Sequence, residues 1–149
     1  MKKFLFDCGT RDLTASIGLF VLRVSIGLMM LLGHGIPKIK NFDKLKAAWF
    51  VPDFFPLKYM SPQVSLMATI GAEVVAAGLL IIGFATRPAA FIFAFAMVIA
   101  AFDKHASDPF GVKELALMYL VGGVVILLTG AGSWSLDAGI HKEGKRRRW

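Results

Sequence analysis

Four long apolar stretches, separated by polar segments, dominate the hydropathy pattern of this chain. They cover about residues 13–38, 61–84, 88–105 and 114–130. Each is a continuous apolar run rather than an alternation of apolar and polar residues, so each predicts a helix and not a strand. A helix of about 20 residues crosses the ~30 Å hydrocarbon core of a bilayer, and lipid admits only helices or closed barrels. The pattern therefore predicts an all-α fold, a four-helix transmembrane bundle.

The connection between the first two apolar stretches mixes aromatic residues with lysines and prolines. Trp49, Phe50, Phe54 and Phe55 all fall within residues 39–60. Such a mixture suits a segment in the lipid headgroup layer, where lysines reach toward water and aromatic rings enter the hydrocarbon. We predict an amphipathic interfacial segment between helices 1 and 2. It either covers the outer mouth of the bundle or only anchors the chain at the interface.

Composition supports the membrane interpretation. The 149 residues are 56% hydrophobic and 18% charged, with a mean hydropathy of +0.65, whereas soluble domains average about 45–50% apolar and about 25% charged. Disordered, collagen-like and disulfide-scaffold classes are excluded, and residues 1–149 are expected to form a single domain. Cys8 has no partner cysteine in the chain, which argues against an internal disulfide or a Cys-x-x-Cys relay. Residues 1–10 hold no apolar run of signal-peptide length, so we expect the first span to stay in the mature protein.

The net charge of +7 does not indicate nucleic-acid binding. The basic residues lie between and beyond the apolar runs, without zinc-finger spacing or an aromatic RNA-binding signature. Their position favours contact with anionic lipid headgroups. An even number of spans puts both termini on one side of the membrane, and the dense basic cluster in the tail, residues 141–149, favours the cytoplasm for that side.

Two ionisable residues, Arg23 and Glu73, interrupt the first two spans. Charged groups at membrane depth are costly and by default suggest function. The two residues lie at similar depths, roughly 14 Å and 16 Å from the same side at 1.5 Å of rise per residue. The sequence therefore predicts an ion pair in which the guanidinium donates two parallel hydrogen bonds to the carboxylate. Such a pair serves either to fix the register of the two helices or to handle protons or a ligand.

Further polar residues gather toward the outer ends of the helices. His34 and Lys38 follow Arg23 at helical spacing and share its face. Spans three and four contribute polar residues near the same level. We therefore predict a polar outer-side pocket, above Arg23 and Glu73, formed by His34, Lys38, Asp103, His105 and Glu114.

The chemistry of this predicted pocket points away from a metal. Two histidines and two carboxylates are possible ligands, but neither Cys-x-x-Cys nor His-Glu-x-x-His spacing supports zinc. We therefore assign no metal ligand. A pocket that binds a small polar head group, or that relays protons beside a redox carrier, fits the residue types at least as well.

Four sequence elements, in order, are similar to those of a known family. The first is RVSIGL at residues 23–28 followed by HGIPK at residues 34–38. The second is Glu73 followed by Gly78, Gly83, Thr86 and Arg87. The third is His105, then Glu114 with LMY at residues 117–119. The fourth is GAGSWSLD at residues 130–137, with Ala131 where proline is frequent. Together they resemble the DoxX family of small four-helix membrane proteins.

The resemblance implies an integral, multi-pass protein of the cytoplasmic (cell inner) membrane. Some relatives are associated with quinone-linked thiosulfate oxidation or with membrane oxidoreductase complexes that answer thiol stress, and many have no assigned reaction. The chain contains no flavin, haem or iron–sulfur motif, so we expect no intrinsic cofactor.

Two functions remain open. In the first, the chain is an oxidoreductase subunit, the membrane component of a quinone-linked redox system. It would bind quinone near His34, His105 and Glu114, pass protons toward Arg23 and Glu73, and receive electrons from a partner protein. In the second, it is a non-catalytic scaffold or a carrier for a lipid-like or small polar solute. The expected partners are the lipid bilayer, quinone, a redox partner protein and a second copy of the chain in a homo-oligomer, but no nucleic acid.

Overall fold

A computed structural model describes residues 9–10 and 12–140 of the chain. Cys8 and the basic tail at 141–149 lie outside the described residues. Throughout the described part, the regular secondary structure is helical, without a strand. The predicted all-α fold is confirmed.

The first span is one continuous rod built from three segments. These are α2 (Leu13–Met30), the π-helical turn η1 (Leu31–Gly35) and α3 (Ile36–Lys40), together 28 residues long. Asp12 starts the rod, because its carboxylate accepts a hydrogen bond from the Ala15 amide at 2.7 Å and so satisfies a free donor of the first turn. The short helix α4 (Phe42–Leu45) follows.

The second span follows the 3₁₀ turn η2 (Leu57–Tyr59). It comprises α5 (Pro62–Ile70), the π-helical turn η3 (Gly71–Ala76) and α6 (Ala77–Ile82). It begins at Ser61, whose hydroxyl accepts from the Val64 amide at 3.3 Å. It ends at Gly83, whose φ of +70° is the left-handed conformation that terminates many helices.

The third and fourth spans are α7 (Thr86–Ile99) with the π-helical turn η4 (Ala100–Lys104), and α8 (Phe110–Thr129). The third begins two residues before the predicted start at Pro88. The cause is a cap from far along the chain, because the Asp137 carboxylate accepts from the amides of Ala85 and Thr86 at 2.8 and 2.9 Å. All four spans are long and apolar enough to cross a membrane, and the prediction of a four-helix transmembrane bundle is confirmed.

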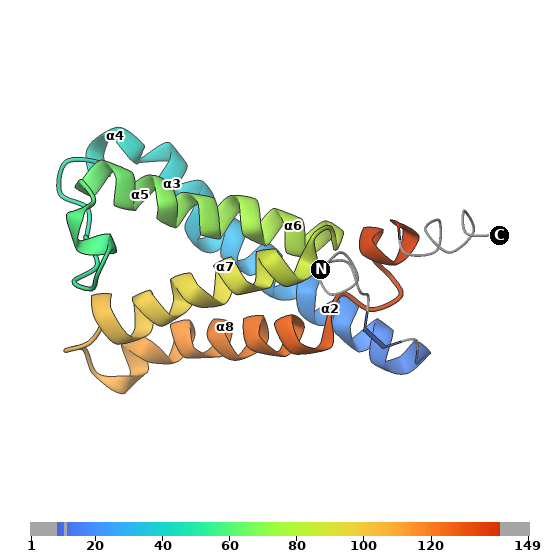
Figure 1. Cartoon of the computed structure of the whole chain (residues 1–149). Coiled ribbons are helices and arrows are strands. Elements are labelled where there is room, and N and C mark those ends of the chain that lie inside the picture. Colours follow the sequence, from blue (N-terminus) through green and yellow to red (C-terminus); the bar gives the residue numbers. More distant parts are fainter. Residues whose placement is uncertain (1–8, 11, 141–149) are drawn as a thin grey trace.

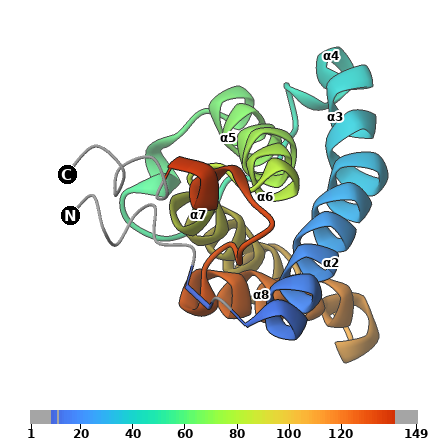
Figure 2. The same ribbon diagram turned by 90° about the vertical axis from the view of Figure 1, so that its right-hand side faces the viewer.

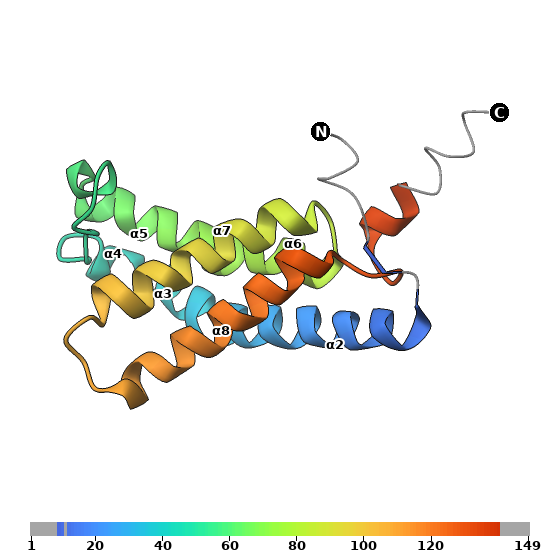
Figure 3. The ribbon, with the colours of Figure 1, turned by 60° about the horizontal axis from the view of Figure 1, so that its bottom comes forward.

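The four spans form a bundle with two distinct ends (Figure 1), which Figure 2 shows in a view along the bundle. The interfacial connection, residues 41–61, and the turn between η4 and α8 lie at one end, which we call the loop end. The start of α2 and the helical residues 136–140 lie at the other, which we call the terminal end. In Figure 3, α7 and α8 run side by side while α2 crosses α8.

Small residues allow the close approach of neighbouring helices that membrane bundles require. A Cβ at Gly27 would lie only 3.0 Å from the Ala77 carbonyl oxygen, and one at Gly123 only 3.1 Å from the Phe93 ring. The shared core fills the middle of the bundle. Its buried members are Ile26, Met30, Ala76, Ala77, Leu80, Ala89, Ala90, Phe93, Met97, Tyr119 and Ile126.

Candidate functional site

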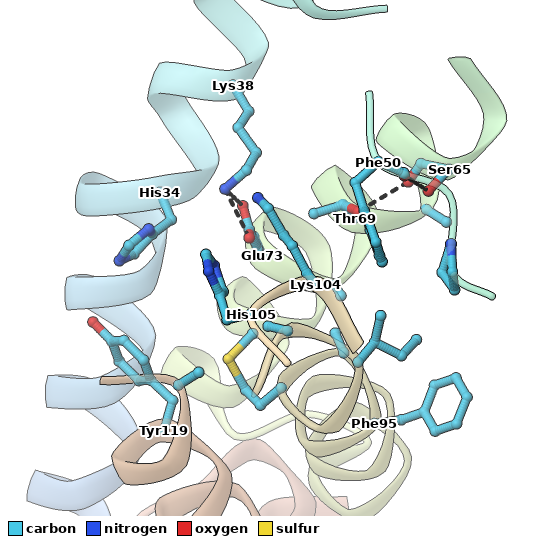
Figure 4. A pocket seen from close by; sticks show the side chains of 18 of the residues that line it. His34, Lys38, Phe50, Ser65, Thr69, Glu73, Phe95, Lys104, His105 and Tyr119 are labelled. Atoms are coloured by element: carbon cyan, nitrogen blue, oxygen red, sulfur yellow. Dashed lines mark hydrogen bonds and ion pairs between the residues drawn. The ribbon is translucent and has the colours of Figure 1, made fainter. Parts of the chain in front are cut away.

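A cavity of about 310 Å³ lies in the loop-end half of the bundle, beneath the connection between the first two spans. Residues of all four spans line it, and most of its wall is apolar or aromatic. Figure 4 shows how its polar side chains converge toward one part of the cavity. Ligand pockets commonly combine apolar walls with a few converging polar groups in this way. The polar side chains that line the cavity include His34, Lys38, Glu73, Lys104, His105 and Tyr119.

Three of these side chains come from π-helical turns. His34 lies in η1, Glu73 in η3 and Lys104 in η4. A π turn closes hydrogen bonds between residues five apart instead of four, so it widens the helix locally and shifts the face on which the following residues lie. Short π-helical segments inside α-helices are frequent at functional sites. The cavity is therefore surrounded by three local departures from regular helix.

Lys38 and Glu73 join the first two spans across the cavity wall. The ammonium nitrogen lies 2.6 and 2.8 Å from the two carboxylate oxygens. Only 15% of the Lys38 side chain and 8% of the Glu73 side chain are exposed. Each charge thus has a partner, as buried charges require.

Trp49 and two lysines together form one part of the cavity wall. The Lys38 and Lys104 ammonium groups lie 5.7 and 4.6 Å from the centre of the Trp49 ring, within the range of cation–π attraction. Lys104 makes no hydrogen bond or ion pair with another described residue, unlike Lys38. The cavity therefore offers one ammonium group whose hydrogen-bond donors are unused by the described part of the protein.

His34 of η1 and Tyr119 of α8 face each other across the cavity. Their rings are perpendicular, with centres 6.0 Å apart, and Phe93 supports Tyr119 from the core with centres 6.1 Å apart. Tyr119 is 6% exposed, yet within the described residues neither its hydroxyl nor the His34 imidazole makes a hydrogen bond. Polar groups in an apolar environment normally find a partner. Both groups are therefore available to a ligand.

His105 connects the cavity with the surface of the loop end. Its ring lines the cavity, and its Nδ1 lies 2.6 Å from the carboxylate of Asp108, a side chain that is 45% exposed. The carboxylate engages one ring nitrogen, Nδ1, and leaves the other, Nε2, available for a hydrogen bond to a ligand or water. Asp108 is a residue that the sequence analysis did not single out.

The predicted ion pair between Arg23 and Glu73 is wrong. Arg23 is fully buried and donates to the carbonyl oxygens of Leu80 and Ile81 at 2.7 and 3.2 Å, and to that of Trp134 at 2.5 Å. Helical side chains lean toward the start of their own helix. Because the first two spans are antiparallel, Arg23 reaches toward the terminal end and Glu73 toward the loop end. Arg23 therefore contributes nothing to the cavity.

Asp103 and Glu114 do not line the cavity either, contrary to the predicted pocket. The Asp103 carboxylate accepts from the Asp53 amide at 2.9 Å and so holds the interfacial connection against η4. Glu114 is exposed; it lies within α8, which begins at Phe110, four residues before the predicted start. The structure brings together His34, Lys38, Glu73 and His105 of the predicted set.

Lys104, Trp49 and Tyr119 belong to the cavity but not to the predicted set. Lys104 directly precedes His105 in the chain, and this proximity was a signal for it. Tyr119 is the last residue of the LMY element on which the family resemblance rests, but nothing in the sequence placed its hydroxyl in the predicted pocket. Among the described residues no group of three His, Cys, Asp or Glu side chains is arranged to hold a metal ion.

Comparison with known proteins identifies the family of this chain. The DoxX family model matches residues 18–106, more than half of the chain. The chain belongs to the DoxX family. The matched region of this DoxX protein contains His34, Glu73, Lys104 and His105, whereas Tyr119 lies beyond it. An uncharacterized protein of Haemophilus influenzae is 25% identical over 96% of both chains. No solved structure matches the chain.

Proposed function

We propose that this DoxX protein binds the head group of a membrane quinone in the loop-end cavity, as the membrane component of a quinone-linked redox system. The observation that carries the proposal is the set of unused hydrogen-bond donors, His34, Tyr119 and Lys104, around an apolar cavity. A quinone ring is flat and apolar and carries two carbonyl oxygens that only accept hydrogen bonds. His34 and Tyr119 can donate to one carbonyl, and Lys104 to the other.

The proton supply for such a reaction is His105 with Asp108. Reduction of a quinone to a quinol takes up two electrons and two protons. The His105 ring lies between the cavity and the exposed Asp108 carboxylate, so it can exchange protons with water at the loop end. The electrons come from a redox centre on a partner protein. With the termini in the cytoplasm of an inner-membrane protein, as proposed from the basic tail, this exchange occurs on the outer side.

Trp49 supplies the test, because it lines the cavity and a bound quinone quenches nearby tryptophan fluorescence. We would replace Trp134 and Trp149 with Phe, reconstitute the protein in phosphatidylcholine vesicles and titrate it with a decyl-substituted benzoquinone. We expect saturable quenching, and an affinity about fivefold lower for Tyr119→Phe, the loss of one hydrogen bond. Tyr59→Phe is the matched control, because Tyr59 is 75% exposed and absent from the cavity lining. Absence of saturable quenching would refute the proposal.

A second candidate function is that of a carrier for an anionic, lipid-like solute. The observation that favours it is the charge of the cavity, where Lys104 has no carboxylate within ion-pair distance in the described residues while Lys38 already holds Glu73. Lys104→Gln separates the two candidates, because glutamine keeps a donor but removes the charge. Quinone affinity should change little in this variant, whereas retention of phosphatidylglycerol, measured by native mass spectrometry, should fall if the carrier function is correct.

A further inference from the structure

The cavity continues from its polar part toward the gap between α5 and α7. Two alanines of α5 and η3, Ala68 and Ala72, line it on one side, and Ala96 and Ala100 line it on the other. The cavity lining continues past these alanines to Ile92 and Phe95 of α7, whose side chains are exposed. The space therefore extends from Glu73 and Lys104 toward the outer surface of the bundle.

The far end of this space is apolar and open to the surroundings of the bundle. Ile92 and Phe95 of α7 line the cavity, yet they are 50% and 42% exposed. In Figure 4, Phe95 lies on the side opposite His34 and Tyr119. Phe54 of the interfacial connection packs edge-on against Phe95 at the rim of this end, with ring centres 6.1 Å apart. Phe95 lies inside the third membrane span, so the opening faces lipid hydrocarbon.

We propose that the ligand enters this cavity sideways from the bilayer, between α5 and α7, and keeps a hydrocarbon chain in the opening against Ile92 and Phe95. The proposal rests on the proposed function for the head group and adds a class of ligand, an amphiphile with a long apolar chain. The asymmetry of the cavity supports it. Donors and charges lie at one end, alanines in the middle and exposed apolar side chains at the other, in the order of a head group and its chain.

The test compares two quinones that differ only in their hydrocarbon chain. The protein with Trp49 as its only tryptophan, in phosphatidylcholine vesicles, is titrated with 2,3-dimethoxy-5-methyl-1,4-benzoquinone and with its decyl-substituted form. Affinities are expressed against the mole fraction of quinone in the membrane, so that simple partitioning cancels. We expect the decyl form to bind at least about threefold more tightly, because its chain gains close packing contacts with Ile92 and Phe95 beyond those that it makes with lipid.

Ala68→Leu tests whether the hydrocarbon chain of the quinone lies in the opening. Ala68 is an exposed residue at the edge of the cavity, so leucine fills the opening without overpacking the core. We expect the affinity for the decyl form to fall at least about threefold, to the level of the short form, because the leucine side chain displaces the hydrocarbon chain, while the affinity for the short form changes less than about twofold. Val75→Leu is the matched control on the same span, since Val75 is 62% exposed and does not line the cavity.

Each outcome decides between the two proposals. Equal affinity for the two quinones, with no effect of Ala68→Leu, overturns the sideways entry and leaves the head-group site standing. A loss caused by Leu115→Phe on α8 but not by Ala68→Leu also overturns it, because Leu115 lines the cavity on another side. Failure of both quinones to quench Trp49 overturns this inference together with the proposed function.

Discussion

The Lys38 ammonium and the Glu73 carboxylate form an ion pair between the first two spans, with both carboxylate oxygens within 2.8 Å of the nitrogen. The pair forms part of the wall of the loop-end cavity and is almost shielded from solvent. Removing one partner leaves the other charge buried, which costs more than the pair itself contributes. The stability of this end of the bundle therefore depends on both residues together.

A double-mutant cycle on Lys38 and Glu73 checks this dependence. We expect Lys38→Met and Glu73→Gln each to lower the free energy of unfolding by about 3 kcal/mol, and the double variant to lose much less than the sum. Unfolding in mixed detergent micelles, followed by circular dichroism, gives these values. Lys46 and Asp43, an exposed pair at 2.7 Å, provide the control, with little effect expected from Lys46→Met. Additive losses for Lys38 and Glu73 would contradict the coupling.

Gly35→Ala tests the contact between η1 and η3. A Cβ at Gly35 would meet the Val74 side chain and lie 3.0 Å from the Glu73 carbonyl oxygen, so the first two spans must separate beside the cavity. We expect a loss of about 1–3 kcal/mol in the free energy of unfolding. Gly33→Ala is the matched control, because nothing lies within 4 Å of its Cβ position, and it should be neutral or slightly stabilising. Equal thermal stability of the two variants would refute the close contact.

Arg23→Lys tests the role of the buried guanidinium at the terminal end. Lysine cannot bridge the Leu80 and Trp134 carbonyls as the two guanidinium nitrogens do. We expect a loss of roughly 2 kcal/mol, about one hydrogen bond to a charged group, measured as detergent unfolding. Quinone affinity of the folded protein should stay the same, because Arg23 lies outside the cavity lining. A stable variant with reduced affinity would instead place Arg23 in the binding or proton path.

Asp137→Ala tests the cap that starts α7. The carboxylate accepts from the amides of Ala85 and Thr86, and the Asp137 amide donates to the Gly83 carbonyl at 2.9 Å. Loss of such a cap costs about 1–2 kcal/mol. We expect faster hydrogen exchange at Ala85 and Thr86, with the exchange of the second turn of α5 as the internal control. Unchanged exchange at both amides would mean that the helix start does not need the carboxylate.

Much of the fold could be predicted, because lipid imposes a simple rule on sequence. A long apolar run must be a helix, and the predicted second span, residues 61–84, differs from the observed Pro62–Ile82 by only one or two residues at each end. The start of α7 could not be predicted in the same way. Its cap comes from Asp137, about fifty residues further along the chain, and no pattern near the start of the helix indicates such a distant partner.

The candidate site was only partly predictable, for two geometric reasons. Spacing placed His34 and Lys38 on one face, and both line the cavity. Depth alone paired Arg23 with Glu73, but the lean of side chains along antiparallel helices separates residues of equal depth. The π turns carry no sequence signal of their own, so only the place of Lys104 beside His105 in the chain pointed to it, and the direction of its side chain was not predictable.

The π turns also bear on how such a cavity changes during evolution. A turn with bonds between residues five apart holds one residue more than the α-helical turn it replaces. Insertion or deletion of a single codon in η1, η3 or η4 would therefore redirect His34, Glu73 or Lys104 while leaving the anchored terminal end of the bundle untouched. A lineage can in this way change the polar groups of the cavity one helix at a time and keep the same bundle.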